Sequence, residues 1–206
     1  MKNRRELTKE YKNKRAAIKK RLNEFRKLSN KSRRQLFTEL CFCLLTPQSN
    51  ARHCDEAIQE LKRRDLIFKG SASSIRPVLK GKARFHNKKA RYIVGARACF
   101  DNSVLKSCDI PRIRELLVNN IKGLGYKEAS HFLRNIGLGR DIAILDRHIL
   151  KNLKIYGAIT RVPASITPGM YLNIEEKAKK FARSVKIPLE ELDLLFWSKE
   201  TGGIFK

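Results

Sequence analysis

Residues 121–130 read IKGLGYKEAS, and they place two glycines, Gly123 and Gly125, one residue apart just before an apparent helix. Glycine permits positive φ angles, so the chain can reverse sharply between a helix that ends at residues 119–120 and one that starts near Lys127. This predicts a helix-hairpin-helix. Backbone amides at such a turn can approach a phosphate, aided by the positive end of the following helix dipole. A lone Gly-x-Gly leaves an ordinary helix connection and a phosphate-binding hairpin equally open.

Helical periodicity of apolar residues extends over most of the chain on both sides of this hairpin. The first thirty residues carry apolar side chains at steps of three, four and seven, which predicts an amphipathic helix with a basic outer face. Turn residues such as KGSASS and FDNS separate further helical patterns, and only IAIL is expected to be extended. Hardly any segment alternates with period two, so the sequence predicts an all-α fold. The further helical patterns cover residues 31–50, 50–67, 87–100, 110–120, 129–141, 146–157, 173–187 and 188–206.

The charge of the chain indicates its partner. Lysine and arginine total 46 residues against 20 acidic residues, which gives a formal net charge of +26. Such an excess repels itself unless a polyanion is nearby, so nucleic acid is the leading partner. The alternative is a solvated surface of the thermophile kind, which usually raises both signs of charge together. No apolar run reaches the roughly 18 residues that a membrane span needs, and the N-terminus lacks the apolar region of a signal peptide. We expect an intracellular protein, in the cytoplasm or nucleoid, with no membrane partner.

The five cysteines predict no metal site. Their number is odd and they form no disulfide-like framework, which suits a reducing compartment. Cys41 and Cys43 lie in the apolar stretch LCFCLL, and no second cysteine or histidine pair stands at zinc spacing. Buried structural thiols are therefore favoured over metal ligands.

The hairpin and a downstream aspartate together resemble one superfamily of enzymes. The motif IKGLGYKEA is followed, nineteen residues after its lysine, by the aspartate of ILDRH. This arrangement resembles the helix-hairpin-helix DNA glycosylases, whose hairpin reads LPGVGxKxA and is followed by a VDxH stretch. The chain departs from that pattern at Lys122, where proline is usual, and in GLGRDIAILD, which lacks the proline of the family's Gly/Pro-plus-Asp signature. Neither departure touches the reactive groups.

Both flanks of the motif extend the resemblance. LLTPQSNAR resembles the family's early helix-loop, and the ending LDLLFWSKETGGIFK resembles the archaeal-type 8-oxoguanine DNA glycosylases. Endonuclease III relatives carry a four-cysteine iron-sulfur loop after the aspartate, whereas no cysteine here follows Cys108. The resemblance implies a DNA glycosylase and AP lyase that excises 8-oxoguanine from double-stranded DNA without a cofactor, and we expect a monomer. Two alternatives stay open: a glycosylase for oxidised pyrimidines or mispaired bases, and a non-catalytic helix-hairpin-helix module that only grips the DNA backbone.

The same resemblance assigns the reactive residues. An amine that attacks the sugar C1′ displaces the base and remains attached as a Schiff base, and β-elimination of the 3′ phosphate can follow. The attacking amine must be uncharged, and a helix N-terminus, neighbouring cations and desolvation each disfavour an ammonium. Lys127, in the first turn of its helix, is the candidate nucleophile. Asp146 is implied to stabilise positive charge on the deoxyribose, beside an ordinary role as a helix N-cap. His148 and the hairpin glycines Gly123 and Gly125 are candidate DNA contacts, although a purely structural histidine is equally open.

A base inside a duplex must be flipped out and held in a pocket before such an attack. Trp197, the only tryptophan, and Phe85 are the candidates for holding the purine between them, with core packing as the alternative. Gln48 corresponds to the family's wedge that fills the vacated stack, with a simple turn residue as the alternative. A carboxylate near N7 attracts 8-oxoguanine, which has a donor there, and repels guanine, which has an acceptor. The resemblance implies that this carboxylate is the α-carboxylate of the terminal Lys206, with Asp193 at the other edge of the base.

The resemblance finally implies two helical lobes. Residues 31–149 form one lobe, which ends in the hairpin and the aspartate loop, and residues 1–30 with 150–206 form the other. We expect the active site in the cleft between them.

Overall fold

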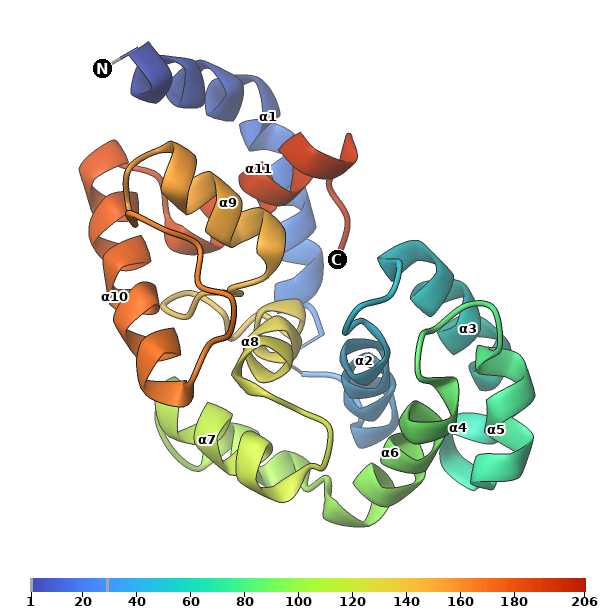
Figure 1. The fold of residues 1–206 in the computed structure, drawn as a ribbon. Coiled ribbons are helices and arrows are strands. Elements are labelled where there is room, and N and C mark those ends of the chain that lie inside the picture. Colours follow the sequence, from blue (N-terminus) through green and yellow to red (C-terminus); the bar gives the residue numbers. More distant parts are fainter. Residues whose placement is uncertain (1, 29) are drawn as a thin grey trace.

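In the computed structural model, which describes residues 2–28 and 30–206, the chain folds into α-helices, and the described residues contain no strand. The predicted all-α class is confirmed, and most predicted helices are present (Figure 1). The elements are α1 (Lys2–Arg26), α2 (Arg33–Leu45), α3 (Ala51–Arg63), α4 (Leu66–Lys69), α5 (Ala72–Leu79), α6 (His86–Cys99), the 3-10 helix η1 (Asn102–Lys106), α7 (Ile110–Asn120), α8 (Tyr126–Asn135), α9 (Arg147–Ile155), α10 (Pro168–Val185) and α11 (Leu189–Thr201).

Two of the helices that differ from the prediction, α5 and α10, do so because of their N-caps. Helix α5 begins within KGSASS, which the sequence indicated as a turn, because the Ser71 side chain accepts a hydrogen bond from the backbone N–H of Ser74 at 3.2 Å. Helix α10 begins five residues before its predicted start, with Thr167 as N-cap and Pro168 in the first turn. Serine and threonine clusters that look like turns can therefore start helices when they cap an amphipathic segment.

The buried apolar residues form two clusters. The first draws on α2 to α8 and ends at Ile142. The second joins α1 to the chain after that point, from Ala143 through α9, α10 and α11. We propose that these clusters are the cores of two lobes, with the boundary between Ile142 and Ala143. The sequence placed this boundary after residue 149, but Ile149 packs in the second cluster.

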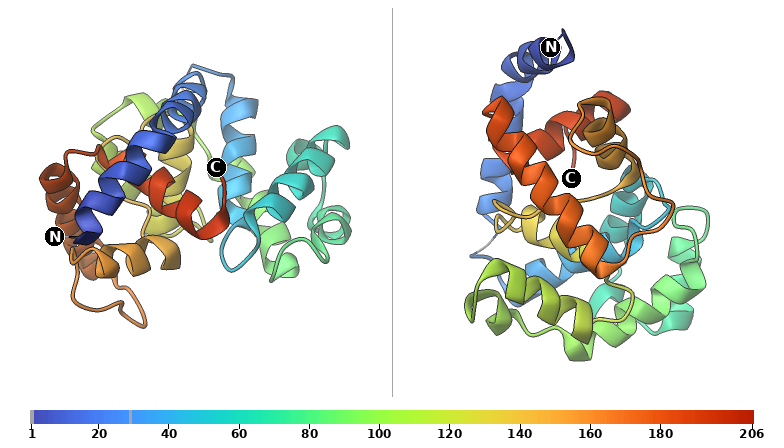
Figure 2. Two further views of the ribbon diagram at one scale, coloured as in Figure 1. Left: turned by 90° about the horizontal axis from the view of Figure 1, so that it is seen from above. Right: turned by 60° about the vertical axis from the view of Figure 1, so that its left-hand side comes forward.

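Helix α8 lies where the two clusters meet. It packs against α2 and α7 of the first group and also contacts α1 of the second. Figure 1 shows α8 near the centre of the molecule, and in both turned views of Figure 2 the C-terminus also lies near the middle. Side chains on α8 can therefore reach both groups of helices.

The predicted hairpin joins α7 to α8, but its two glycines act differently. Gly123 has a φ of +91°, and a Cβ atom there would lie 2.3 Å from the Tyr92 ring. Gly125 has a φ of −91°, which any residue adopts, so the expected positive angle is wrong at that position. A Cβ atom at Gly125 would lie 3.0 Å from a carboxylate oxygen of Glu128. The tight turn thus requires glycine at residue 123, whereas the backbone angles at residue 125 are open to other residue types.

Candidate active site

A cavity of about 900 Å³ opens between the two groups of helices. It is lined by the loop between α2 and α3, one face of α8, the segment around the start of α9, residues 162–166, α11 and the last residue of the chain. The predicted site residues that line it are Gln48, Lys127, Asp146, His148, Asp193, Trp197 and Lys206. Phe85 and the hairpin glycines are not among the lining residues.

Lys127 is the second residue of α8, directly after the N-cap Gly125 and Tyr126. Its side chain is 23% exposed, and its Nζ lies 3.6 Å from Oε1 of Glu128. His131 and Arg134 follow at helical spacings of four and three residues, so all three side chains share the face of α8 that lines the cavity. The amine therefore stands at the positive end of a helix, inside the cavity and beside one carboxylate.

Asp146 is the N-cap of α9, as its sequence position predicted. Its Oδ1 accepts a hydrogen bond of 2.8 Å from the backbone N–H of Ile149. The short segment that leads into Asp146 belongs to no helix and supplies the cavity residues Ile144 and Leu145. Its backbone polar groups need partners other than a helix or a sheet, because they are buried.

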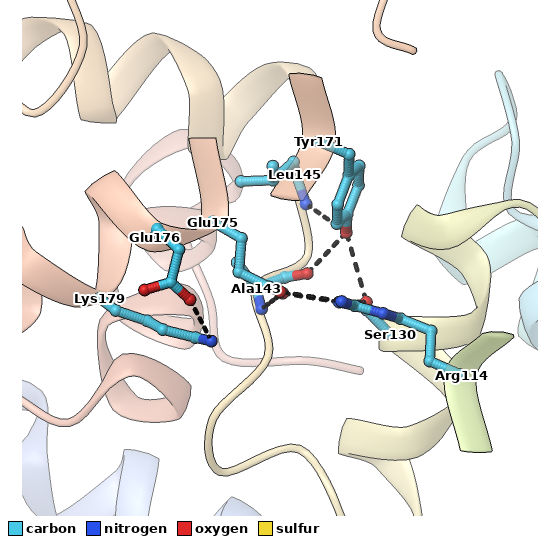
Figure 3. Close-up of polar contacts among 8 residues, drawn as sticks. All are labelled: Arg114, Ser130, Ala143, Leu145, Tyr171, Glu175, Glu176 and Lys179. Carbon is cyan, nitrogen blue, oxygen red and sulfur yellow. Dashed lines mark hydrogen bonds and ion pairs between the residues drawn. The ribbon is translucent and has the colours of Figure 1, made fainter. Parts of the chain in front are cut away.

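A buried ion pair supplies the first of these partners (Figure 3). Arg114 of α7 donates to both carboxylate oxygens of Glu175 of α10, at 2.6 and 2.9 Å, and both side chains are at most 3% exposed. Oε1 of Glu175 also accepts a hydrogen bond of 2.7 Å from the backbone N–H of Ala143. Arg114 donates in addition to Oγ of Ser130 on α8, at 3.2 Å. The ion pair thus ties the segment before Asp146 to α7, α8 and α10.

Tyr171 of α10 supplies two further partners. Its hydroxyl donates to the carbonyl oxygen of Ala143 at 2.6 Å and accepts from the backbone N–H of Leu145 at 3.3 Å. It also lies 3.3 Å from Oγ of Ser130, one helical turn beyond Lys127. Burial raises the pKa of Tyr171 far above its usual value, so the hydroxyl keeps its proton for these contacts. Glu175 and Tyr171 thus hold the segment before Asp146, and their contacts with Arg114 of α7 and Ser130 of α8 fix the position of Asp146 relative to α8.

Asp193 of α11 lies in the wall of the cavity, where it is 8% exposed. Its Oδ2 lies 3.7 Å from Nε of Arg134. Burial raises the pKa of Asp193 to about 6 against the lowering effect of Arg134, while Asp146 raises it further and Lys127 lowers it. Asp193 is thus close enough to both predicted catalytic groups to sense their charges, and a perturbed carboxyl in a cavity is typical of functional sites.

His131 is a cavity residue that the sequence analysis missed. It is 6% exposed, and its ring meets that of Phe42 edge-on at 5.7 Å. Burial holds the pKa of His131 well below its usual value, the cations Arg134, Lys127 and Lys206 lower it further, and a hydrogen bond with the backbone of Lys206 opposes this shift. The imidazole is therefore neutral. The signal for it was its spacing of four residues from Lys127 on the same helix.

The structure does not bring the two predicted aromatic residues together. Trp197 stacks on Phe205 of the C-terminal tail, with ring centroids 6.1 Å apart and an interplanar angle of 28°. Phe85 is 52% exposed and lies outside the cavity lining. It follows Arg84, whose backbone N–H donates to Oγ of Ser49 in the loop between α2 and α3. Phe85 therefore stands beside a cavity loop, and the expected pairing with Trp197 is absent from this conformation.

The loop that carries Gln48 is held by a buried lysine. Nζ of Lys89 donates to the carbonyl oxygens of Leu45 and Pro47, each at 2.7 Å, and to Oγ of Ser49 at 2.9 Å. Burial lowers the pKa of Lys89 to about 8. Gln48 itself has a φ of +53°, and such angles in residues other than glycine concentrate at functional sites. Gln48 thus projects from a fixed loop at the cavity.

His148 lies at the rim of the cavity on α9. Its Nδ1 lies 3.8 Å from Oε2 of Glu200, and its side chain is 43% exposed. Glu200 also accepts hydrogen bonds from Lys151 and Asn152, at 2.8 and 3.0 Å. His148 is therefore accessible to a ligand that covers the rim.

Among the described residues, no group of three or more histidine, cysteine, aspartate or glutamate side chains could hold a metal ion. Cys41 and Cys43 are fully buried, and burial raises the pKa of both thiols, as expected for structural cysteines. No helix within residues 2–28 and 30–206 is long and apolar enough to cross a membrane.

Comparison with known proteins places this cavity in a family context. The family model described as 8-oxoguanine DNA glycosylase matches residues 18–187. A Fusobacterium nucleatum protein named 8-oxoguanine DNA glycosylase/AP lyase is 45% identical over an alignment of 210 positions, and the alignment covers 98% of this chain and 96% of the relative. A relative of the same name from Methanocaldococcus jannaschii is 40% identical over 193 residues, which cover 92% of this chain and 91% of the relative.

Two solved structures share the whole fold. One is a crystal structure of the Methanocaldococcus jannaschii 8-oxoguanine glycosylase/lyase in complex with a 15mer DNA containing 8-oxoguanine. It matches with a TM-score of 0.91 and 38% identity and covers 100% of both chains. The other is the 8-oxoguanine DNA glycosylase of Thermotoga maritima, with a TM-score of 0.88 and 33% identity over 100% of this chain and 99% of that one.

Proposed function

This chain belongs to the 8-oxoguanine DNA glycosylase family, and we propose that it excises 8-oxoguanine from double-stranded DNA and cleaves the resulting abasic site, with Lys127 as nucleophile and Asp146 as its electrostatic partner. The observation that carries the assignment of roles is the shared cavity. Lys127 enters it from the N-terminus of α8 and Asp146 from the N-terminus of α9, and the network of Arg114, Glu175 and Tyr171 fixes one helix relative to the other.

The chemistry follows from these positions. The lone pair of Nζ of Lys127 attacks C1′, the C1′–N9 bond breaks, and its electron pair leaves with the base. Positive charge develops on the deoxyribose in this step, and the carboxylate of Asp146 stabilises it. The attached ammonium loses one proton, the C1′–O4′ bond then breaks with its electron pair passing to O4′, which takes up a proton, and the nitrogen lone pair forms the C=N bond of a protonated Schiff base. Removal of a C2′ proton then expels the 3′ phosphate, which is the lyase step.

The lesion is selected in the same cavity. The flipped base lies against Trp197, with Gln48 entering the vacated stack and Asp193 at one base edge. The α-carboxylate of Lys206 accepts from the N7–H of 8-oxoguanine and repels the N7 acceptor of guanine. Phe85 is exposed beside the loop of Gln48, and we propose that it contacts the DNA around the flipped nucleotide.

The protein binds DNA through contacts with the phosphate backbone of the duplex. The hairpin of Gly123 and Gly125 offers backbone amides to a phosphate, and the accessible His148 offers a second contact at the cavity rim. The net charge of +26 supplies the sequence-independent attraction. One chain carries all the residues proposed for the reaction, so the reaction needs no second copy, and we propose that the enzyme acts as a monomer.

The test is covalent trapping. Incubation of the protein with DNA containing 8-oxoguanine and borohydride should reduce the Schiff base and leave a stable protein–DNA adduct. Lys127→Gln should abolish the adduct, because glutamine has no amine to form it. Lys154→Gln removes one exposed lysine from α9 outside the cavity and is the matched control. An undiminished adduct in Lys127→Gln would reject Lys127 as nucleophile.

The same experiment separates the alternatives. A glycosylase for another lesion would form its adduct faster with oxidised pyrimidines or mispaired thymine than with 8-oxoguanine. A module that only grips the DNA backbone would form no adduct with any substrate. Trapping on a panel of these duplexes therefore tests the substrate and the mechanism independently.

A further inference from the structure

We propose that Glu39 and Asp55 form a socket for the side-chain ammonium of Lys206, and that this socket positions the terminal α-carboxylate that discriminates 8-oxoguanine from guanine. The inference rests on the proposed function. It assigns a specificity role to two acidic residues on helices that bear neither Lys127 nor Asp146.

The socket is built from three helices of the first group. Nζ of Lys206 donates to Oδ1 of Asp55 on α3 at 2.7 Å and to Oε2 of Glu39 on α2 at 3.3 Å. It also lies 4.5 Å from the centre of the Phe42 ring. Oε1 of Glu39 accepts a hydrogen bond of 2.6 Å from Nδ2 of Asn135 on α8, so the carboxylate is itself held in place. The ammonium therefore sits between two acceptors, of which Asn135 holds one in place, and an aromatic face.

Burial makes this contact specific for a cation. The side chains of Lys206, Glu39 and Asp55 are 18%, 9% and 26% exposed. Burial alone would lower the pKa of Lys206, but the charges of Glu39 and Asp55 and the hydrogen bond to Asp55 outweigh it, and the pKa is raised. A largely buried carboxylate such as Glu39 needs a charged or hydrogen-bonding partner, and a neutral side chain at residue 206 would leave part of this need unmet.

The path of the tail explains why an anchor is needed. Helix α11 ends at Thr201, its C-cap Gly202 has a φ of +79°, and the chain then turns back towards the first group of helices. Ile204 packs on the second apolar cluster, whereas the next residue, Phe205, packs on the first and lies under the guanidinium of Arg52. Figure 1 shows the C-terminus between α11 and the helices α2 and α3. The tail thus crosses from one group to the other, and Lys206 lines the cavity at the end of this crossing.

A chain end without an anchor is normally mobile. A mobile carboxylate would spend little time at N7 of the base, and its preference for a donor over an acceptor would be averaged away. By holding the ammonium on α2 and α3, the socket confines the α-carboxylate of the same residue to the cavity. The identity of the last side chain then matters as much as the presence of a terminal carboxylate.

The test compares single-turnover excision from duplexes that carry 8-oxoguanine or guanine at the same position. Lys206→Met keeps the terminal carboxylate and the apolar stem but removes the ammonium. The pair Glu39→Gln with Asp55→Asn keeps the shapes of the socket but removes its charges. Each protein should lose about tenfold or more of the excision preference for 8-oxoguanine, as expected when a charge-assisted hydrogen bond is lost. Cleavage of a preformed abasic site should fall much less, because no base is read in that reaction.

Combining Lys206→Met with the socket pair should lose no more preference than either change alone, since all three substitutions break the same contact. Glu60→Gln, which removes a carboxylate on the solvent side of α3 from its pair with Lys82, is the matched control and should keep the wild-type preference. A wild-type preference in Lys206→Met would overturn the proposal, as would equal losses in excision and in abasic-site cleavage. Failure of the wild-type protein to excise 8-oxoguanine would instead reject the proposed function itself.

Discussion

At the scale of single residues, the two oxygens of Asp146 have different surroundings. Oδ1 caps α9 through the backbone N–H of Ile149, whereas Oδ2 accepts no hydrogen bond among the described residues. A structural role and an electrostatic role can therefore reside in one side chain. Substitutions that separate the two roles are available, because asparagine caps a helix about as well as aspartate does.

Asp146→Asn should keep the cap and remove the charge. We expect single-turnover excision of 8-oxoguanine to fall on the order of a hundredfold, because the charge on the deoxyribose loses its partner, while the thermal midpoint stays close to that of the wild type. Asp146→Ala should show the same loss of excision and also lose about 1 kcal/mol of unfolding free energy. Equal excision by wild type and Asp146→Asn would show that Asp146 acts only as a cap.

Asp193 leads to a prediction about pH. Its folded-state pKa of about 6 lies above the ordinary value, so the folded protein binds this proton more tightly than the unfolded chain does. Its contribution to stability is present below about pH 4 and is lost as the pH rises through about 6. Relative to Asp193→Asn, the unfolding free energy of the wild type should fall by about 2 to 3 kcal/mol between pH 4 and pH 7. Denaturant unfolding of both proteins across this range measures the difference, and a constant difference would show that Asp193 is not perturbed.

At the scale of elements, the hairpin between α7 and α8 determines where α8 begins and therefore where Lys127 lies in its first turn. Only one of its glycines is forced by geometry. Gly123 has a positive φ and lies against the Tyr92 ring, whereas Gly125 has an ordinary φ and faces the flexible end of Glu128. The two glycines of one motif thus form a matched pair for mutation.

Gly123→Ala should be the more damaging change. It places a side chain at a positive φ and forces Cβ into an aromatic ring, so we expect a loss of at least about 2 kcal/mol of unfolding free energy. Gly125→Ala should cost less than about 1 kcal/mol, chiefly through a poorer N-cap. For a chain of this size, thermal unfolding should resolve the two by several degrees. Equal shifts in both variants would contradict the geometric distinction.

The segment before Asp146 is also an element-scale feature, because it is held without a helix or a strand. Glu175 and Tyr171 from α10 bind the N–H and C=O of Ala143 and the N–H of Leu145, and the same network reaches α8 through Ser130. A buried ion pair of this kind is weak evidence for stability but can fix one arrangement among several. We infer that its main effect is to hold the start of α9 against α8.

At the scale of the whole molecule, the charge of +26 determines how binding responds to salt. Each DNA phosphate that the protein neutralises releases counterions, so the logarithm of the binding constant should fall linearly with the logarithm of salt concentration, by about 0.9 per phosphate. With about six phosphates neutralised, affinity for undamaged duplex should drop about a thousandfold between 50 and 200 mM salt. Fluorescence anisotropy with a labelled duplex measures this slope. A flat dependence would mean that the basic surface plays no part in binding.

The sequence by itself determined the local features of this protein. Apolar spacing predicted most helices, Gly123 predicted the sharp turn, and Asp146 predicted the N-cap of α9, because each depends on residues within one or two turns of chain. The motif around Lys127 and the aspartate loop carried the family resemblance. The caps that start α5 and α10 were missed because serine and threonine are common both in turns and at helix N-caps, so their presence does not tell the two apart.

Only the tertiary structure decided which distant residues meet. It brought Lys206 to Glu39 and Asp55, and it stacked Trp197 on Phe205 in place of Phe85. It also divided the buried apolar residues into two clusters that meet between Ile142 and Ala143, where Glu175 binds the backbone N–H of Ala143. Such contacts depend on how helices pack across long sequence separations, and no local pattern of residues encodes them.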